Sequence, residues 1–179
     1  MKLLGISGAL RKDSTNTKLV REAARLFGEA EFTLADLNLP LYDGDLEEAE
    51  GIPPAVQRLA DQIAEADAVV ISGPEYNKGI TGVLKNALDW VSRTEGAPWQ
   101  DKPVAIMSSA AGRAGGERTQ MMLRWCMVPF NTRILQGPEV LVAQGTRQFD
   151  ETGRLTNEIN EKALAALMQA LRAVAEAGR

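Results

Sequence analysis

The stretch from residue 68 to residue 91 most constrains the fold of this chain, because it joins a buried strand to an amphipathic helix. The run Ala68–Gly73 is short, apolar and rich in β-branched residues, which is typical of a strand buried on both faces. After it, apolar residues recur at helical spacing, at Ile80, Val83, Leu84, Ala87, Leu88 and Val91. The polar cluster Glu75-Tyr76-Asn77 lies between them, at the carboxyl end of the strand. Open α/β sheets bind their ligands at that position.

Strands and helices alternate in the same way along the rest of the chain. Apolar runs predict strands at 2–8, 31–37, 68–73, 103–107 and 140–143, and apolar stripes predict helices at 19–27, 56–63, 80–91 and 121–127 and from Asn157 onward. The acidic segment 43–51 is predicted to be an exposed connection. The alternation predicts one α/β domain over residues 1–179, with three α/β/α layers around a five-stranded parallel sheet of order 2-1-3-4-5. In that order the loops after the first and third strands face one crevice.

The composition excludes several classes of chemistry. The chain has no histidine, so it cannot form a Ser-His-Asp triad or a histidine-ligated metal site. Its single cysteine, Cys126, excludes an internal disulfide and a thiolate metal or iron–sulfur site. The net charge of −4 argues against nucleic-acid or anionic-membrane partners. We therefore expect the chemistry to come from a bound cofactor, with no metal site and no catalytic side chain.

The start of the chain favours the cytoplasm. Met1 leads directly into an apolar strand, and we recognise no signal peptide and no membrane span. No membrane partner is therefore expected.

The loop after the first strand is dense in hydroxyls, amides and cations, with the sequence SGALRKDSTNT over residues 7–17. Hydroxyls and an arginine beside a helix N-terminus form a phosphate site, because the unpaired backbone N–H groups there favour an anion. The alternative is that Ser14, Thr15 or Asn16 only caps the helix and that Arg11 is a solvated charge. The loop matches neither a Walker A motif nor the dinucleotide fingerprint, which leaves a mononucleotide as the expected ligand.

Three motifs together resemble the NADPH-dependent FMN reductases, a flavodoxin-like family that includes chromate, quinone and azo reductases. The motifs are residues 7–16, then Pro74–Asn77 with LKNALDW at 84–90, then Ser108-Ser109 with Gly112 and 115–116. The resemblance covers most of the chain in register, and the second motif is the long and specific one. It implies a flavodoxin-like fold, FMN as the cofactor and NADPH or NADH as the co-substrate.

Carried over residue by residue, the resemblance implies a flavin site with three parts. The FMN phosphate would be held by Arg11, Ser14 and Asn16, with Thr17 as a weaker candidate. One side of the isoalloxazine ring would be wrapped by Pro74, Glu75, Tyr76 and Asn77, and its other edge lined by Ser108, Ser109 and Gly112. The chain departs from the family at Ala9, where a phosphate-binding serine is common, and at Gly79 and Thr81, where serine and proline are common. Arg113 is either solvent-facing or a nicotinamide-phosphate ligand.

The predicted function is hydride transfer from NADPH or NADH through FMN to a small acceptor: a quinone, an azo dye, a metal oxyanion such as chromate, or free flavin. The alternative is a flavodoxin-type electron carrier with a protein partner, which Arg11 and Lys12 in the phosphate loop disfavour. A serine hydrolase ranks last because the chain lacks a base to activate the serine.

The resemblance also implies a homodimer or homotetramer, with Trp90, Trp125 and the methionine-rich helix as interface candidates. The alternative for those residues is a packed monomer core.

Overall fold

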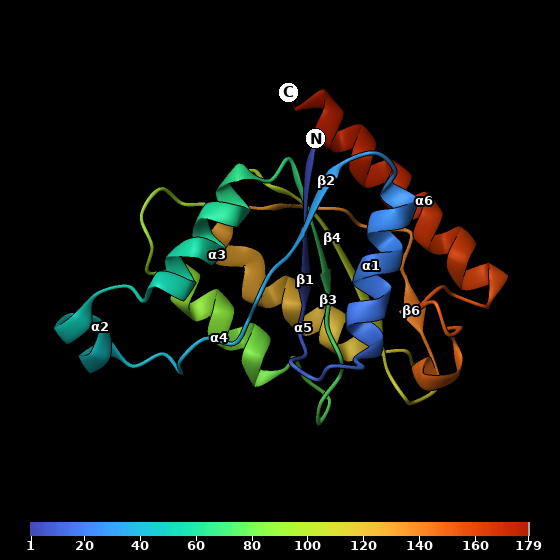
Figure 1. Cartoon of the computed structure of the whole chain (residues 1–179), viewed down its shortest axis with the longest axis horizontal. Helices are drawn as coiled ribbons and strands as arrows, with labels where there is room; N and C mark the ends of the chain where they lie inside the picture. Colours follow the sequence, from blue (N-terminus) through green and yellow to red (C-terminus); the bar gives the residue numbers. More distant parts are fainter. Residues whose placement is uncertain (179) are drawn as a thin grey trace.

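A parallel β-sheet forms the middle layer of the computed structural model, which describes residues 1–178 (Figure 1). Its strands follow the order β2-β1-β3-β4-β5, with β6 also paired to β4. The central strands β3 and β4 are buried along their whole length, as their continuous apolar sequences predict. The predicted order 2-1-3-4-5 is therefore confirmed. The strands are β1 (Lys2–Ser7), β2 (Glu31–Leu34), β3 (Ala68–Ser72), β4 (Pro103–Ser109), β5 (Arg133–Ile134) and β6 (Leu141–Val142).

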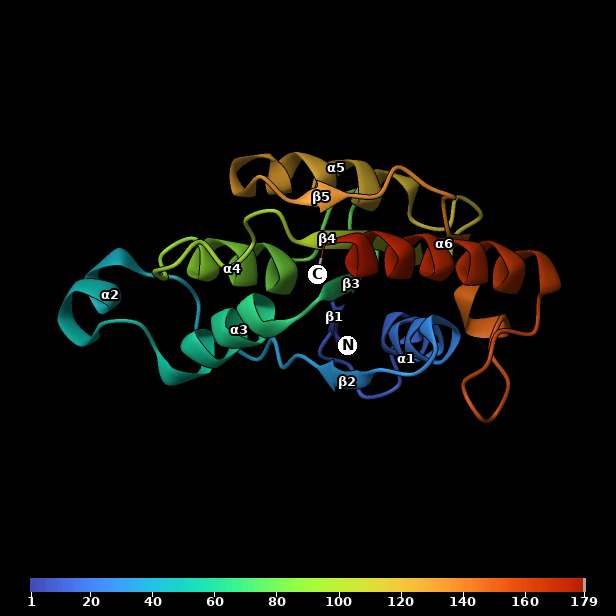
Figure 2. The same ribbon diagram turned by 90° about the horizontal axis from the view of Figure 1, so that it is seen from above.

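Helices cover both faces of the sheet (Figure 2). One face packs against α1 (Thr15–Phe27) and α6 (Glu158–Ala177), whose apolar stripes are buried with the side chains of β1, β3 and β4 that point to that face. The other face packs against α3 (Pro54–Glu65), α4 (Gly82–Val91) and α5 (Glu117–Met127). Within residues 1–178, no helix combines the length and apolarity needed to cross a bilayer.

The fifth strand position differs from the prediction, because it is divided between two short segments. The predicted strand at 140–143 corresponds to β6, which pairs with Ser108 and Ser109 at the end of β4. The start of β4, at Pro103 and Val104, pairs instead with β5. A segment as short as Arg133–Ile134 shows no measurable alternation of apolar and polar residues, so sequence periodicity did not reveal it.

Segment 43–51 is exposed, as predicted, but most of it is helical. Helix α2 (Gly44–Glu50) has no buried residue and projects from the edge of the molecule (Figure 1). The Asp43 side chain caps it by accepting a hydrogen bond from Asp45 N, at 3.0 Å. Because α2 buries no face, it has no apolar stripe, and the stripe is the signal by which the other helices were predicted.

Candidate functional site

The loops that follow β1 and β3 meet at the lower edge of the sheet as drawn in Figure 1. Gly8 N donates to Ser72 O at 2.8 Å, and Thr81 Oγ1 donates to Gly8 O at 2.7 Å. A Cβ added at Gly8 would lie 3.2 Å from Pro74 Cδ and 3.3 Å from Gly73 Cα, so the two loops approach closely at this glycine. The loops after the first and third strands therefore lie side by side, as the predicted sheet order requires, and a ligand crevice between them stays a prediction.

The first loop brings a free cation to the N-terminus of α1. Ser14 is the N-cap, and its hydroxyl accepts a hydrogen bond from Asn16 N at 3.2 Å. Arg11 is exposed, and its side chain makes no ion pair or hydrogen bond with any residue of the described part of the chain. The first turn of α1 carries no acidic residue. An anion at this position would meet both the helix dipole and an uncompensated guanidinium.

The side chains of Asn16 and Thr17, also predicted to hold the phosphate, are bonded to protein atoms. Thr17 Oγ1 donates to Ser7 Oγ at 2.8 Å. The Asn16 carboxamide is buried and bonds to Ser72 and to the backbone of Ser109. The structure therefore gives both side chains protein partners, and a phosphate contact from either of them stays a prediction.

A tight hairpin forms the second part of the site. Tyr76 and Gly79 exchange two backbone hydrogen bonds of 3.1 Å, and the residues between them, Asn77 and Lys78, have φ angles of 51° and 66°. This geometry is that of a type I′ turn. Pro74 is buried at its base, whereas Tyr76 is 56% exposed. The hairpin therefore presents an aromatic ring and the Asn77 amide at the carboxyl edge of the sheet.

Glu75 braces this hairpin against α5. Its carboxylate accepts hydrogen bonds from Arg118 N at 3.2 Å and from Arg118 Nη1 at 3.3 Å. Thr119 Oγ1 adds a hydrogen bond to Pro74 O, at 3.2 Å. The carboxylate thus satisfies a free N–H group in the first turn of α5 and complements the dipole of that helix. A ring contact from Glu75 stays a prediction, since both of its oxygens already have partners.

In the third loop, only Gly112 of the three predicted residues reaches the surface. Ser108 Oγ donates to Gly115 O at 2.7 Å and accepts from Gln120 Nε2 at 2.9 Å, inside the protein. Ser109 Oγ is buried without a hydrogen-bond partner among the described residues and lies against Gly145. Both hydroxyls therefore face the interior. A ring contact from this loop would come from Gly112 and the small residues beside it.

A fourth loop, which the sequence reasoning missed, follows β6. Gly145 N donates to Ala110 O at 2.9 Å and Gln144 N donates to Gly112 O at 3.2 Å, so this loop lies directly beside the third. Thr146 and Arg147 are exposed on it. The predicted strand at 140–143 carried the missing signal, because a parallel strand next to β4 also ends at the ligand-binding edge.

The four loops together form a surface suited to a flat ligand that carries a phosphate. The cation and the helix N-terminus lie in the first loop, the aromatic side chain lies on the hairpin, and small residues (Gly112 with Ala110, Ala111 and Ala114) line the third loop. Cys126 lies elsewhere, beside Trp125 and Phe130 in a hollow of about 690 Å³, and burial raises the pKa of its thiol. This surface thus offers positioning and charge and has no side chain suited to covalent or proton-transfer chemistry near neutral pH.

Comparison with known proteins gives a consistent result. Residues 1–147 match the family model described as NADPH-dependent FMN reductase. The chain is 42% identical to an NAD(P)H-dependent FMN reductase of Pseudomonas aeruginosa, over 97% of this chain and 93% of that protein. It is 38% identical to a quinone reductase of Escherichia coli, over 88% of this chain and 86% of that one. A flavoenzyme NAD(P)H:(acceptor) oxidoreductase from Paracoccus denitrificans superposes with a TM-score of 0.87 at 33% identity, covering 98% of this chain and 97% of the other.

Proposed function

This chain belongs to the NADPH-dependent FMN reductase family, and on that premise we propose how its four-loop surface works. The protein is an FMN-dependent oxidoreductase that takes its electrons from NADPH or NADH. The observation that carries the site assignment is Arg11, which is exposed without a side-chain partner among the described residues and lies just before α1, whose first turn holds no acidic residue. It supports a phosphate at α1 and a ring system between the hairpin and the third loop.

The residues present fit FMN. The phosphate would meet the N-terminus of α1, the Ser14 hydroxyl and the Arg11 guanidinium, whose fork of N–H donors suits a phosphate. Tyr76 and Asn77 would flank the ring, with Gly112 at its other edge. The missing hydroxyl at Ala9 makes the backbone N–H groups of this loop more important. The exposed Arg147 on the fourth loop adds a further positive charge at the same edge of the sheet.

Bound FMN supplies the hydride chemistry that the side chains of this protein lack. The contribution of the protein is positional: α1 and Arg11 anchor one end of the cofactor, and the braced hairpin fixes where the ring lies. The small residues of the third loop leave room for a nicotinamide and then for an acceptor at the ring face. No side chain needs to move a proton for the first transfer, which agrees with the absence of histidine from the chain.

We propose a quinone as the first acceptor class to examine, since several similar proteins are named quinone reductases. Azo dyes, chromate-like oxyanions and free flavin remain further candidates. The relatives are named as enzymes, and no observation favours the alternative of an electron carrier.

We also propose a cytoplasmic location, which fits the use of a soluble nicotinamide, and fractionation of the source cells would test it.

The purified protein provides the direct test of this function. We expect bound or added FMN to give absorbance near 450 nm, and anaerobic NADPH or NADH to bleach it. A protein that takes up no FMN would refute the proposal. A yellow protein that neither nicotinamide reduces would instead favour the carrier.

We further propose that a second copy of the chain covers α5, giving a homodimer or a homotetramer. Met121 is 52% exposed and Trp125 is 71% exposed on this helix, and Met122 and Val128 continue the apolar surface. The 690 Å³ hollow between α4 and α5 adjoins it. Exposed apolar surface on this scale marks interaction sites in soluble proteins.

Trp90, predicted as a second interface candidate, is a core residue. It is fully buried, its Nε1 donates to Pro40 O at 2.8 Å, and the Tyr42 ring packs edge-on against it at 5.0 Å. The physical reason is its place on the stripe of α4 that faces the core and the 40–42 segment. Only Trp125 of the two tryptophans is therefore available to a partner.

A further inference from the structure

The side chain of Asn16 occupies a position where a strand would otherwise continue. Its Nδ2 donates to Ser109 O at 2.8 Å, and its Oδ1 accepts from Ser109 N at 2.9 Å. The same Oδ1 accepts from Ser72 Oγ at 2.8 Å. Asn16 is 2% exposed, and Ser72 and Ser109 are equally buried. One carboxamide thus links the start of α1 to the ends of β3 and β4.

The hydrogen bonds between Asn16 and Ser109 form because the pairing of β3 with β4 ends before Ser109. The ladder between β3 and β4 ends at the Ser72–Met107 pair, followed by one hydrogen bond from Gly73 N to Met107 O. Beyond it, β4 is held on its other side, where Ser108 N donates to Val140 O and Ala110 N donates to Val142 O. The N–H and C=O of Ser109 point the opposite way, toward the side of β3. However, β3 has already ended at Ser72 and offers them no backbone partner there. Buried backbone groups require partners, and the Asn16 carboxamide provides both.

We infer that Asn16 is a positioning residue of the flavin site. Its carboxamide sets the spacing between the phosphate end of the site, at Arg11 and Ser14, and the loop after β4 that carries Gly112. It does so because Asn16 is only two positions beyond the N-cap of α1 while its side chain is bound to the last residue of β4. This inference rests on the proposed function. It assigns Asn16 to the support of the site, in place of the direct phosphate contact that the resemblance implies.

The role requires a side chain that both donates and accepts at one site. Asn16→Asp keeps the size and the acceptor oxygen Oδ1, but while ionised it cannot donate to Ser109 O, and its negative charge would face that carbonyl. Ser72→Ala is milder, since it removes one bond and leaves the exchange with Ser109 intact. Ser72→Ala should therefore weaken the link between α1 and β4 in part, and Asn16→Asp should weaken it severely.

The experiment combines two measurements. FMN affinity is obtained from the quenching of flavin fluorescence, and exchange of the Ser109 amide is followed by NMR in the flavin-free protein, relative to Val70 in the centre of β3. For Asn16→Asp we expect a loss of FMN affinity of about tenfold or more together with faster relative exchange at Ser109. For Ser72→Ala we expect a smaller loss in the same direction. Ile63→Ala, a buried substitution near the far end of α3, should lower stability without changing either quantity.

Three results would overturn the inference. In the first, Asn16→Asp and Ser72→Ala both bind FMN as tightly as the wild type. In the second, Asn16→Asp loses FMN affinity while exchange at Ser109 is unchanged, which would make Asn16 a direct ligand. In the third, Ile63→Ala loses as much FMN affinity as Asn16→Asp at equal loss of stability. A wild-type protein that binds no FMN would refute the proposed function as well, whereas the first three results leave that function intact.

Discussion

Arg11 and Ser109 both belong to the motifs that resemble the family, but one is exposed and the other is buried. Arg11 is exposed and without a partner in the described chain, which is the state expected of a residue that awaits an anion. The Ser109 hydroxyl is also without a partner, but it is buried against Gly145. Exposure therefore distinguishes Arg11, whose side chain is open to an anion, from Ser109, whose hydroxyl packs inside the protein.

For Arg11 we predict a direct loss of cofactor binding. Arg11→Ala should weaken FMN affinity by about 1.5–3 kcal/mol, because it removes a hydrogen bond between two charged groups. Fluorescence titration with FMN measures the change. Arg21→Ala, an exposed cation farther along α1, is the matched control and should keep wild-type affinity. Equal affinities for the two variants would place the phosphate elsewhere.

For Ser109 and Gly145 we predict coupled effects on stability. A methyl group at Gly145 would overlap Ser109 Oγ, so Gly145→Ala should cost about 1–3 kcal/mol in the free energy of unfolding. Ser109→Ala removes a hydroxyl that has no hydrogen-bond partner among residues 1–178, and it should change stability by less than about 0.5 kcal/mol or increase it. In the double variant Ser109→Ala/Gly145→Ala, the loss in the free energy of unfolding caused by Gly145→Ala should be smaller than in the single variant. Urea unfolding measures all three, and strictly additive effects would contradict the predicted contact.

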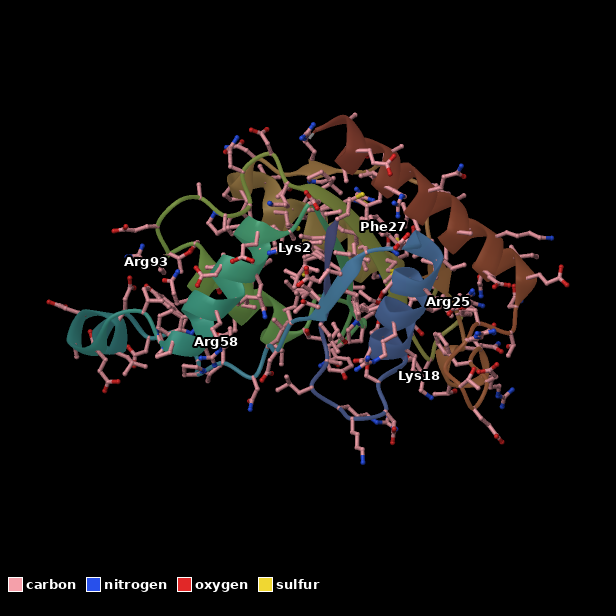
Figure 3. All side chains as sticks on the ribbon, turned by 45° about the horizontal axis from the view of Figure 1, so that its top comes forward. Lys2, Lys18, Arg25, Phe27, Arg58 and Arg93 are labelled. Atoms are coloured by element: carbon pink, nitrogen blue, oxygen red, sulfur yellow. The ribbon has the colours of Figure 1, made fainter. Side chains whose placement is uncertain are left out.

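Among the elements, α2 is the one that the core does not hold. It is tethered by Glu47, whose carboxylate accepts from Arg93 Nε at 3.0 Å and from the Tyr42 hydroxyl at 3.0 Å. Figure 3 shows Arg93 on the side of the molecule from which α2 projects. The preceding segment is fixed more firmly, since Asn86 and Trp90 of α4 both donate to Pro40 O. Helix α2 is therefore an exposed arm. Hydrogen bonds to Pro40 fix the segment before it, and the polar contacts of Glu47 hold the helix itself.

Removing the tether should free the arm without unfolding the protein. Glu47→Gln is expected to speed chymotryptic cleavage near Leu41 and Tyr42 roughly two- to fivefold, the range for loss of an exposed ion pair. Glu48→Gln, its exposed neighbour, is the control and should leave the rate unchanged. If both variants are cleaved like the wild type, the tether has no measurable effect.

The same tether should depend on pH. The hydrogen bond from Arg93 is the main cause that holds the pKa of Glu47 below its usual range. A carboxyl with a lowered pKa in the folded state contributes stability above its unfolded pKa and loses it as the pH falls through the lowered value. Cleavage of the arm by an acid-tolerant protease should therefore rise in that acidic window for the wild type and change less for Glu47→Gln.

At the scale of the whole molecule, the apolar surface of α5 is next to the site. Met122 Sδ accepts from Ile80 N at 3.4 Å at the base of the hairpin, and Arg118 of the same helix binds Glu75. A partner that covers α5 would therefore also press on the element that carries Tyr76. Assembly and cofactor binding are expected to support each other for this reason.

Substitution of Trp125 should test the assembly. The wild type is expected to sediment as a dimer or tetramer at micromolar concentration. Trp125→Glu should raise the dissociation constant by about thirtyfold or more, since it places a charge in an apolar interface. Ile159→Glu is the control, because Ile159 is 78% exposed on α6, away from the proposed interface. A wild-type protein that sediments as a clean monomer would remove the interface proposal.

The sequence by itself determined the class of fold and the edge of the sheet at which we propose the ligand site. Periodicity suffices for this, because buried strands and amphipathic helices must each bury a fixed pattern of side chains. The order of the sheet, the meeting of the loops after β1 and β3, and the start of α6 at the cap Asn157 all follow from local pattern. The sequence marked Thr81 only as a departure from the family, and the structure shows that its side chain caps α4.

Only the tertiary structure decided which residues of the motifs are exposed and which are buried. Asn16 and Arg11 belong to one polar loop in the sequence, yet one is buried under β4 and the other is free in solvent. The split of the last strand position, the fourth loop at Gly145 and the burial of Trp90 were likewise decided by contacts between segments far apart in the chain. The physical reason is that a polar side chain satisfies whichever partner lies nearest in space, and local sequence does not encode that partner.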